Sequence, residues 1–518
     1  MNLPRRIDIT EKQMAALLAR AKRLLSEEDY EIVKGMADTI SFLSRSAGKN
    51  KAHIQKLVAM LFGAITEKTA KVLKEAKAKE SEEKEIKGHG RNAASVYSEA
   101  QKIEVSHEAL KPKDRCPVCK KGKVYDTKEP KIIIRITGQA PLAAKVCELQ
   151  KLRCNLCGQI FTAKAPEGLG DEKYDDASGA MIALLKYGSG LPFNRLESLQ
   201  ESLGVPLPAS TQWEIVEEVA DKIAPAYREL IRKAAQGDVI HNDDTVMKIL
   251  SQINLPDKDR VGRKGMFTSG FMSIANDTRI ALFLTGHNHA GENMAQILAE
   301  RSDELGPVIQ MCDGLSRNIP KEFKTILANC LAHGRRKFVE VNESFPKECE
   351  YVLKTLEKVY ENDAYTKEKN MNPDQRLKYH QENSAKLMED LKIWLTTQLE
   401  DKKTEPNSTL GQAISYMLKH FKGLTLFLRI PKAPLDNNLC EQVLKKAILH
   451  RKNSLFYKTP HGAYVGDLFM SIIHTCSLCK ANPFQYLKTL QQHSSLIAKN
   501  PEKWMPWNFQ EMLINTEE

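Results

Sequence analysis

Apolar residues between positions 10 and 66 recur every three or four residues, which is the spacing of one helix face. They form two successive faces, one made of Ile32, Met36, Ile40 and Leu43 and the other of Ile54, Leu57, Val58 and Leu61. This pattern predicts a helical N-terminal region over residues 1–85. Such faces suit self-association or DNA binding, and equally a hairpin that packs on its own chain.

The apolar pattern stops after Leu73, and residues 67–91 are dense in charge. A segment of this composition cannot bury enough apolar surface to fold alone. It predicts a solvated helix that passes into a linker over residues 86–112, where the basic "KGHGR" is a candidate phosphate contact.

Helical periodicity returns over residues 166–236. Here "NRLESLQESLG", "VPLPAS" and "TQWEIVEEVADKIA" predict a helix, a short turn after a glycine stop, and a second helix begun by Ser or Thr. This is the outline of a DNA-binding helix-turn-helix. Any helical hairpin has the same outline, so both interpretations stay open.

Strand-like runs dominate residues 237–345, beginning with "DVIHNDDTVMKI", "GMFTSGFMSIAN" and "RIALFLTG". A helix candidate, "GENMAQILAERSD", and two further apolar runs, "PVIQMCDG" and "KTILANCLAH", follow. Three strands, a helix, a strand, then another strand and helix predict a ribonuclease-H-like α/β core. Residues 346–432 are helical and highly charged and resemble an insertion. The core resumes over residues 433–500, before a C-terminal tail over 501–518.

Two C-x-x-C pairs lie within residues 113–165, at Cys116, Cys119, Cys154 and Cys157. Four thiolates on two tight turns are the ligands of a closed tetrahedral zinc site. The intervening "KIIIRITG" and "AKVCELQKLRC" are strand-like, so the segment is expected to be a zinc ribbon with structural Zn²⁺. Two unrelated turns with free thiols are the alternative.

Length, net charge and the distribution of apolar residues limit the classes of protein to which this chain can belong. The 518 residues exceed what one hydrophobic core usually serves, so three or more structural units are expected. A net charge of +11 permits a polyanionic partner such as DNA without demanding one. The sequence shows neither a membrane-length apolar run nor a signal-peptide core, and the expected location is the cytoplasm.

Acidic residues at strand ends and on a late helix are candidates for metal-assisted chemistry. Phosphodiester cleavage by two Mg²⁺ ions needs a few carboxylates from separate elements. Asp243 or Asp244, Asp313 and Glu441 fit that requirement. Each has a simpler interpretation: Asp313 precedes a glycine and suits a turn, while Asn438 and Glu441 match a capping box, with Lys445 as an ion-pair partner.

Six separated motifs resemble one known family. In order they are "HNDDT", "CDG", "CLAHGRRKF", "PLDNNLCEQVLKKAILHRKNSLF", "NPFQYLKTL" and "MPWNF", and they are similar to motifs of the insertion-sequence transposases of family 66, a DDE-class group. The resemblance extends over most of the chain, including the zinc segment and "KGHGR".

The resemblance implies a ribonuclease-H-like core that uses Mg²⁺ or Mn²⁺ to nick the ends of an element and join the freed 3′-hydroxyl to target DNA. The family's acidic triad carries over to Asp243, Asp313 and Glu441. Transposition brings two DNA ends together, so a homo-oligomer on double-stranded DNA is expected. Small accessory proteins encoded beside such transposases are candidate partners.

Basic residues beside the motifs are candidate contacts with the DNA backbone. The first group follows the fifth strand and the second lies ten to twelve residues beyond Glu441; the two groups are His333, Arg335, Arg336 and Lys337, and Arg451, Lys452 and Asn453. Pairing with nearby acids and a solvated helix end are the respective alternatives. Asn437 and Asn438 are expected to cap the helix that carries Glu441.

Several positions depart from the family's usual residues, namely Asp244, Leu315, Leu331, Gln442 and Ser454. The acids themselves are retained. Two rival functions remain: a ribonuclease-H-like DNA endonuclease without strand transfer, and a zinc-ribbon DNA-binding protein with an inert core.

The adjacent Asp243 and Asp244 cannot both bind the same metal ions if the strand is regular, because successive side chains point to opposite faces. The motif alignment selects Asp243 as the ligand. Asp244 is then expected on the opposite face or at the rim, with a basic residue as a candidate partner.

Overall fold

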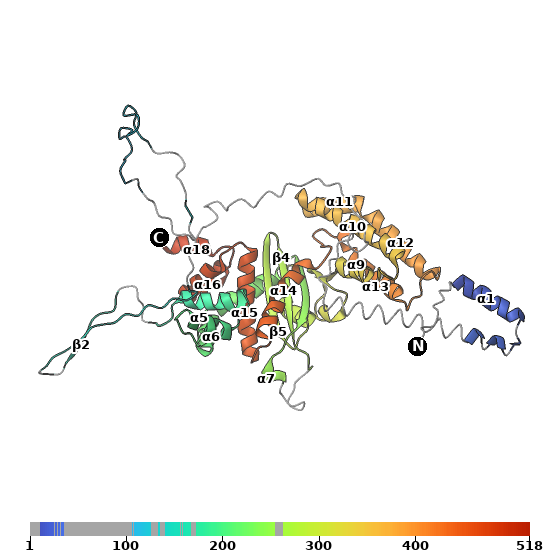
Figure 1. Ribbon diagram of the computed structural model, residues 1–518, viewed down its shortest axis with the longest axis horizontal. Coiled ribbons are helices and arrows are strands. Elements are labelled where there is room, and N and C mark those ends of the chain that lie inside the picture. The colour runs from blue at the N-terminus through green and yellow to red at the C-terminus, as the bar shows by residue number, and fades with distance from the viewer. Residues whose placement is uncertain are drawn as a thin grey trace, which may run out of the picture. The chain divides into compact units, whose positions relative to one another are not determined.

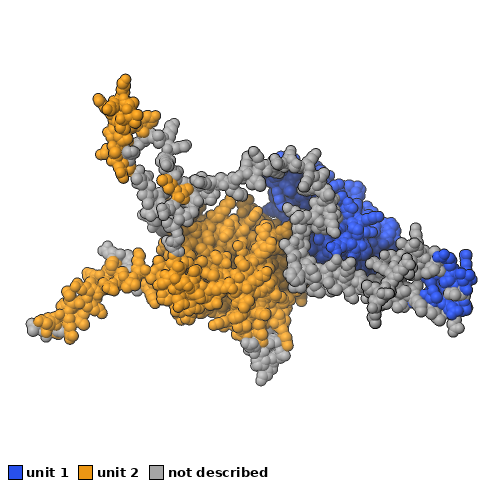
Figure 2. All heavy atoms as spheres, viewed as in Figure 1, with its two compact units in different colours: residues 1–76, 327–436 blue, residues 77–326, 437–518 orange. Residues whose placement is uncertain are grey.

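The computed structural model in Figure 1 describes most of the chain after residue 171 and parts of the region before it. The described residues are 11–24, 26–27, 29–31, 33–35, 106, 108–125, 133–134, 140–155, 157, 159–166, 172–253 and 263–517. Two compact units are coloured separately in Figure 2: residues 1–76 with 327–436, and residues 77–326 with 437–518. We call them the helical unit and the sheet unit.

A mixed sheet forms the centre of the sheet unit, and of its last strand only Ile326 falls within that unit. The strands are ordered β5-β4-β3-β6-β7, with β3 antiparallel to β4, β4 antiparallel to β5, and β3 parallel to β6. Their bounds are β3 Val239–Val246, β4 Phe267–Ala275, β5 Thr278–Gly286, β6 Ile309–Cys312 and β7 Ile326–Asn329. Helix α8 (Ala290–Leu298) lies between β5 and β6 in sequence and α9 (Leu331–Val341) follows β7, which confirms the predicted order of elements and a mixed α/β class.

Strand β3 is regular along its whole length. It pairs with β4 in eight consecutive positions, from Val239↔Ile274 to Val246↔Phe267. Cross-strand partners share a face, so Asp243 and Gly270 lie on one side of the sheet and Asp244 and Ser269 on the other. The expected alternation of the two aspartates is therefore present.

Different helices cover the two faces. Helix α14 (Asn438–Ser454) packs on β3 and β4 over Gly270, where a Cβ atom would lie 2.8 Å from Leu444 Cδ2. On the other face, Asn293 of α8 donates a hydrogen bond to Ser269 Oγ at 2.8 Å. Asp243 thus faces α14, and Asp244 faces α8.

Helix α15 (Pro460–Leu478) closes the open edge of the sheet along β5. Its Asp467, Ser471 and Thr475 accept hydrogen bonds from the backbone N–H groups of Thr285, Phe283 and Ala281 at 2.6, 2.9 and 3.1 Å. A four-residue step on a helix rises about 6 Å, close to a two-residue step on a strand. This match lets one helix satisfy an edge that would otherwise invite another strand.

Helices preceding and following the sheet complete the core of this unit. Helices α4 (Asp176–Ala183), α6 (Ala209–Ala235) and α16 (Pro483–Gln492) pack on one another, and buried Tyr227 and Trp504 lie in the same core as Phe283. The remaining elements are the π-helix η2 (Leu184–Gly188), α5 (Phe193–Ser202), α7 (Leu250–Ile253), α17 (Ser494–Ile497), η6 (Pro501–Trp504) and α18 (Phe509–Glu517).

The predicted helix-turn-helix outline is present as α5, a turn at Gly204 and α6. Gly204 has φ +75°, a conformation that other residues rarely adopt, and it ends α5. The predicted Ser/Thr start of the second helix is wrong. Helix α6 begins at Ala209 after Pro208, whose fixed φ suits a helix entry, and continues through Pro225.

The described part of the helical unit is a set of helices: α1 (Glu11–Leu24), α9, α10 (Pro346–Glu368), α11 (Pro373–Asn383), α12 (Ala385–Glu400), α13 (Thr409–Leu424) and the short η5 (Leu426–Leu428). Buried Asp363 joins α10 to α11 through Arg376 at 2.8 Å and His380 at 3.3 Å. Burial alone would raise the pKa of Asp363, but its three partners, His380, Arg376 and Lys367, hold that pKa below its usual value. The helical character predicted for residues 346–432 is confirmed.

Short strands β1 (Lys151–Arg153) and β2 (Ile160–Thr162) pair antiparallel. Of the strand predicted over residues 144–154, only Lys151–Arg153 forms a strand, and residues 144–150 are irregular. Most of "KIIIRITG", "KGHGR" and the apolar faces from Ile32 to Leu61 lie outside the described residues. Among the helices that are described, none combines the length and the apolar character needed to cross a membrane.

Candidate functional site

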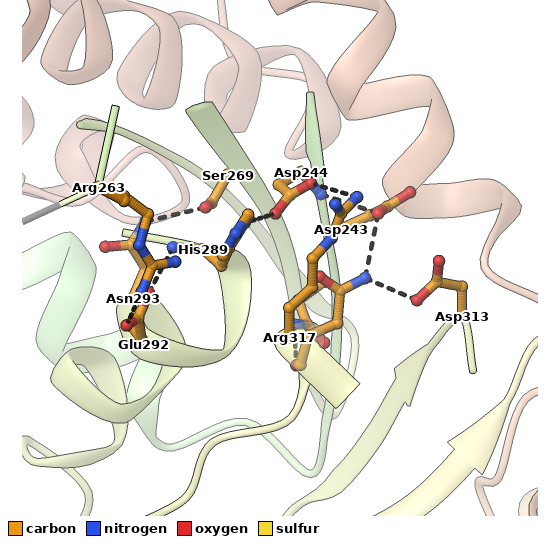
Figure 3. Close-up of polar contacts among 11 residues, drawn as sticks. Asp243, Asp244, Arg263, Ser269, His289, Glu292, Asn293, Asp313 and Arg317 are labelled. Atoms are coloured by element: carbon orange, nitrogen blue, oxygen red, sulfur yellow. Dashed lines mark hydrogen bonds and ion pairs between the residues drawn. The ribbon is translucent and has the colours of Figure 1, made fainter. Parts of the chain in front are cut away.

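Two acids from different strands meet at one amide. Asp243 lies in β3 and Asp313 follows β6 directly; Asn318, the last residue of the turn η4 (Ser316–Asn318), donates from Nδ2 to Asp313 Oδ1 at 2.7 Å and to Asp243 Oδ1 at 3.3 Å. In Figure 3 dashed lines run from Asp243 and from Asp313 to one nitrogen atom between them. Asp313 also accepts from the backbone N–H of Leu315 at 3.0 Å, so it stabilises its turn as the simpler interpretation predicted.

Burial and neighbouring acids disfavour the charge of Asp243. Burial comes first, and the negative charges of Asp313 and Asp244 add to it, raising the pKa of Asp243 to about 6 against hydrogen bonds from Asp244 N–H and Asn318. A carboxylate in this position gains from any cation brought beside it. Two such acids are hard oxygen donors of the kind that Mg²⁺ prefers.

Asp244, in contrast to Asp243, pairs with basic side chains. Its side chain is 1 % exposed and contacts His289 Nδ1 at 2.7 Å and Arg317 at 3.1 Å. His289 precedes α8 and is itself fixed by Glu292, whose carboxylate accepts from His289 N–H and pairs with Arg263 at 2.6 Å. The expected pairing of Asp244 with a basic residue is confirmed.

A buried amide network holds the backbone of η4. The carbonyl oxygen of Asn318 accepts from Asn242 Nδ2 and from Gln310 Nε2, both at 2.7 Å. Gln310 also donates to Asn242 Oδ1 at 2.9 Å and accepts from Thr325. Because these partners lie in β3, β6 and the segment before β7, the position of Asn318 depends on the whole central part of the sheet.

Helix α14 is attached to β3 beside Asp243. Asn437, just before the helix, donates to Asn242 O and lies 3.1 Å from His241 Nδ1, while Cys440 donates to Gly270 O at 3.2 Å. Asn437 lies at the N-cap position of α14 as expected, but its side chain makes no capping hydrogen bond and instead joins the helix to the strand. Glu441 follows in the first turn of α14.

Burial raises the pKa of the Cys440 thiol, and the charges of Asp243 and Glu441 raise it further. Within the described residues, no three His, Cys, Asp or Glu side chains form a group that could hold a metal ion. The structure brings Asp243 and Asp313 together, and the complete triad with Glu441 stays a prediction.

The first group of basic candidates lies on α9 in the helical unit. Arg335 is 8 % exposed, Arg336 and His333 are partly buried, and Lys337 is exposed with its ammonium 5.4 Å from the ring centre of Tyr416. Of the four, Lys337 is the side chain most accessible to a phosphate. Their contact with DNA stays a prediction.

The second group ends α14. Arg451 donates to Thr245 Oγ1 and to Val246 O, and Asn453 donates to Gly190 O at 3.0 Å. These bonds attach the helix end to β3 and to the loop after η2, so a simple solvated helix end is wrong for both residues. Lys452 is exposed.

The two cysteine pairs each lie on a tight turn. Cys116 N–H donates to Gly122 O at 2.8 Å and Gly122 N–H approaches Cys119 Sγ at 3.4 Å; Cys154 N–H donates to Gln159 O at 2.9 Å. The N–H of Gly122 is the first cause of the lowered pKa of the Cys119 thiol. Such turns suit zinc-binding knuckles, and the joint ligand set stays a prediction.

Sequence reasoning missed Asn318, His289 and Arg317. Asn318 and Arg317 follow Asp313 within five residues, and that proximity was the available signal. His289 is 45 positions from Asp244, and only the sheet brings them together.

Comparison with known proteins adds an independent line of information. Residues 174–465 match the model described as the Transposase IS66 family. The uncharacterized protein y4hP of Sinorhizobium fredii (strain NBRC 101917 / NGR234) is 24% identical over 473 residues, covering 84% of this chain and 83% of that protein. The uncharacterized protein y4jD of the same organism is 26% identical over 419 residues, covering 77% and 79%.

Proposed function

This chain belongs to the IS66 transposase family, and we propose that it is a DDE-type enzyme that cleaves transposon ends and transfers the 3′-hydroxyl into target DNA. The observation that carries the proposal is the meeting of Asp243 and Asp313 at Asn318, because the two acids come from different parts of the sheet. Residues 237–345 and 433–500 then form a ribonuclease-H-like core, a description favoured by the strand order and by α14 packing on β3.

Asp243, Asp313 and Glu441 are the proposed ligands of Mg²⁺ or Mn²⁺. Bound divalent ions would activate an attacking oxygen and stabilise the leaving oxygen of the phosphodiester. The chain's own contribution is to hold the acids: β3 and β6 position the two aspartates, and Asn437 and Cys440 attach the start of α14 to β3 and β4 beside them. A cation bound beside Asp243 would favour the ionised form of this carboxyl group, which burial and the neighbouring acids disfavour.

The same proposal gives roles to the other parts of the chain. The cysteine turns bind structural Zn²⁺, and α5 with α6, together with His333, Arg335, Arg336, Lys337, Arg451, Lys452 and Asn453, are proposed to contact double-stranded DNA. Two DNA ends require a homo-oligomer, with small accessory proteins of the same element as further partners. The proposed location of this DNA-processing protein is the cytoplasm.

The test uses a pre-cut DNA end with a 3′-hydroxyl, taken from the sequence flanking the gene, and scores its joining to a plasmid with Mg²⁺ or Mn²⁺. We expect joining by the unmutated protein and by Asp303→Asn, an exposed acid of the same unit, and none by Asp313→Asn. Cleavage without joining would favour an endonuclease. Binding of DNA with neither reaction would favour a protein with an inert core.

A further inference from the structure

Asn318 is buried in an unusual way for an amide. Its side chain and backbone are 0 % exposed, and Nδ2 donates to both Asp313 and Asp243. Its Oδ1 atom is also buried, and none of the described residues donates a hydrogen bond to it. A buried oxygen without a donor destabilises the folded state, because it has given up its hydrogen bonds to water, so its presence here calls for a physical reason.

The NH₂ group and the oxygen of this amide interact with carboxylates in opposite ways, because the first is a hydrogen-bond donor and the second an acceptor. In the structure the NH₂ group donates a hydrogen bond to each of the two acids. A cation bound by both acids would repel the NH₂ group. The amide oxygen, in contrast, is a hard ligand of the kind that Mg²⁺ and Ca²⁺ accept from Asn side chains.

The backbone of Asn318 is held in place, so only its side chain can reorient when an ion binds. Its carbonyl oxygen is held by Asn242 and Gln310 at 2.7 Å, which fixes the main chain beside the acids. A half-turn about the last side-chain bond exchanges the amide nitrogen and oxygen with little change in shape. The oxygen would then take the place of the nitrogen beside Asp243 and Asp313.

We propose that Asn318 is a further ligand of the divalent metal site, donating to the two aspartates without metal and turning its Oδ1 atom to the ion when one binds. The inference rests on the proposed function, because it takes Asp243 and Asp313 as metal ligands. It also supplies a third oxygen donor next to the two acids that the structure brings together.

An alternative role makes the opposite prediction. If Asn318 only occupies the space between the acids as a hydrogen-bond donor, it competes with the ion. Removing its polar atoms would then leave metal affinity unchanged or increase it. If it is a ligand, the same change weakens binding.

Calorimetric titration of the full chain with Mg²⁺, and separately with Mn²⁺, distinguishes the two roles. Asn318→Leu keeps the approximate shape and removes both polar atoms, and we expect its affinity to fall at least tenfold. Asn318→Asp keeps an oxygen ligand and loses the NH₂ donor, and its affinity should equal or exceed that of the unmutated protein. Asn293→Leu makes the same change at another buried Asn, on the α8 face, and should leave metal affinity unchanged.

Unchanged or tighter binding by Asn318→Leu would overturn the inference, as would an Asn318→Asp affinity as low as that of the leucine variant. Should Asn318→Leu fail to fold, Asn318→Ala removes the same atoms with less volume and is judged by the same criterion. If the unmutated protein and Asp313→Asn bind the ions equally, the proposed metal site itself is wrong, which is a separate result from failure at Asn318.

Discussion

The two faces of β3 give adjacent, identical residues different chemistry. Asp243 faces α14 and meets another acid, Asp313, through a neutral amide, while Asp244 faces α8 and is saturated by His289 and Arg317. The charge of Asp313 adds to burial in raising the pKa of Asp243, whereas Asp244 pairs directly with His289 and Arg317. Two adjacent carboxylates in one strand thus differ in chemistry because the sheet gives them different neighbours.

Removing each aspartate in turn gives the largest expected difference between the faces. Asp243→Ala should reduce metal-dependent nicking on the order of 10³-fold or more, because a ligand is lost. Asp244→Ala should retain a measurable fraction of nicking and instead lower the free energy of unfolding by about 1–3 kcal/mol, because His289 and Arg317 lose their partner. Nicking assays and urea unfolding measure the two effects. Equal loss of nicking in both variants would contradict the division between the faces.

The packing of α14 over Gly270 offers a second way to disturb only the Asp243 face. In Gly270→Ala the new Cβ would lie 2.8 Å from Leu444 Cδ2 and 3.0 Å from Leu444 Cγ, so the helix or the side chain must move. We expect a loss of about 1–3 kcal/mol in unfolding free energy, with reduced nicking as Glu441 shifts. Gly286→Ala is the matched control, since its Cβ would meet nothing within 4 Å. Similar results for the two variants would show that α14 does not depend on this close approach.

Another buried carboxylate, that of Asp467, can be compared with Asp243 and Asp244. Its hydrogen bonds to β5 come from neutral donors, Thr285 N–H and Oγ1. Burial raises the pKa of Asp467 from 3.8 to about 7. The folded state thus favours the protonated form, and its contribution to stability is complete below about pH 4 and is lost as the pH rises through about 7.

Asp467→Asn removes this titration. Urea unfolding between pH 5 and 8 should show the unmutated protein losing stability with rising pH relative to the variant, by an amount smaller than the losses above. Ser471→Ala, which alters the same edge of the sheet without removing a titratable group, serves as the control. Parallel stability curves for the unmutated protein and Asp467→Asn would contradict the raised pKa.

Much of the fold was predictable because it follows from local patterns. Strand alternation, turn residues and helical spacing act over a few residues, and they predicted the three strands, α8, β6, β7 and α9 in order. Asn437 lies at the predicted N-cap of α14, but its side chain contacts β3 instead of capping the helix. The Ser/Thr start of α6 was predicted wrongly, because the helix is entered at Pro208.

The sequence by itself determined that Asp243 and Asp244 lie on opposite faces, because side-chain alternation in a regular strand is a property of the backbone. It also determined the candidate acids and the family resemblance, since these are carried by residue identity and order. Only the tertiary structure decided which partners each acid meets. His289 reaches Asp244, and Asn437 reaches β3 from 195 residues away, through strand pairing and helix packing that no local pattern encodes.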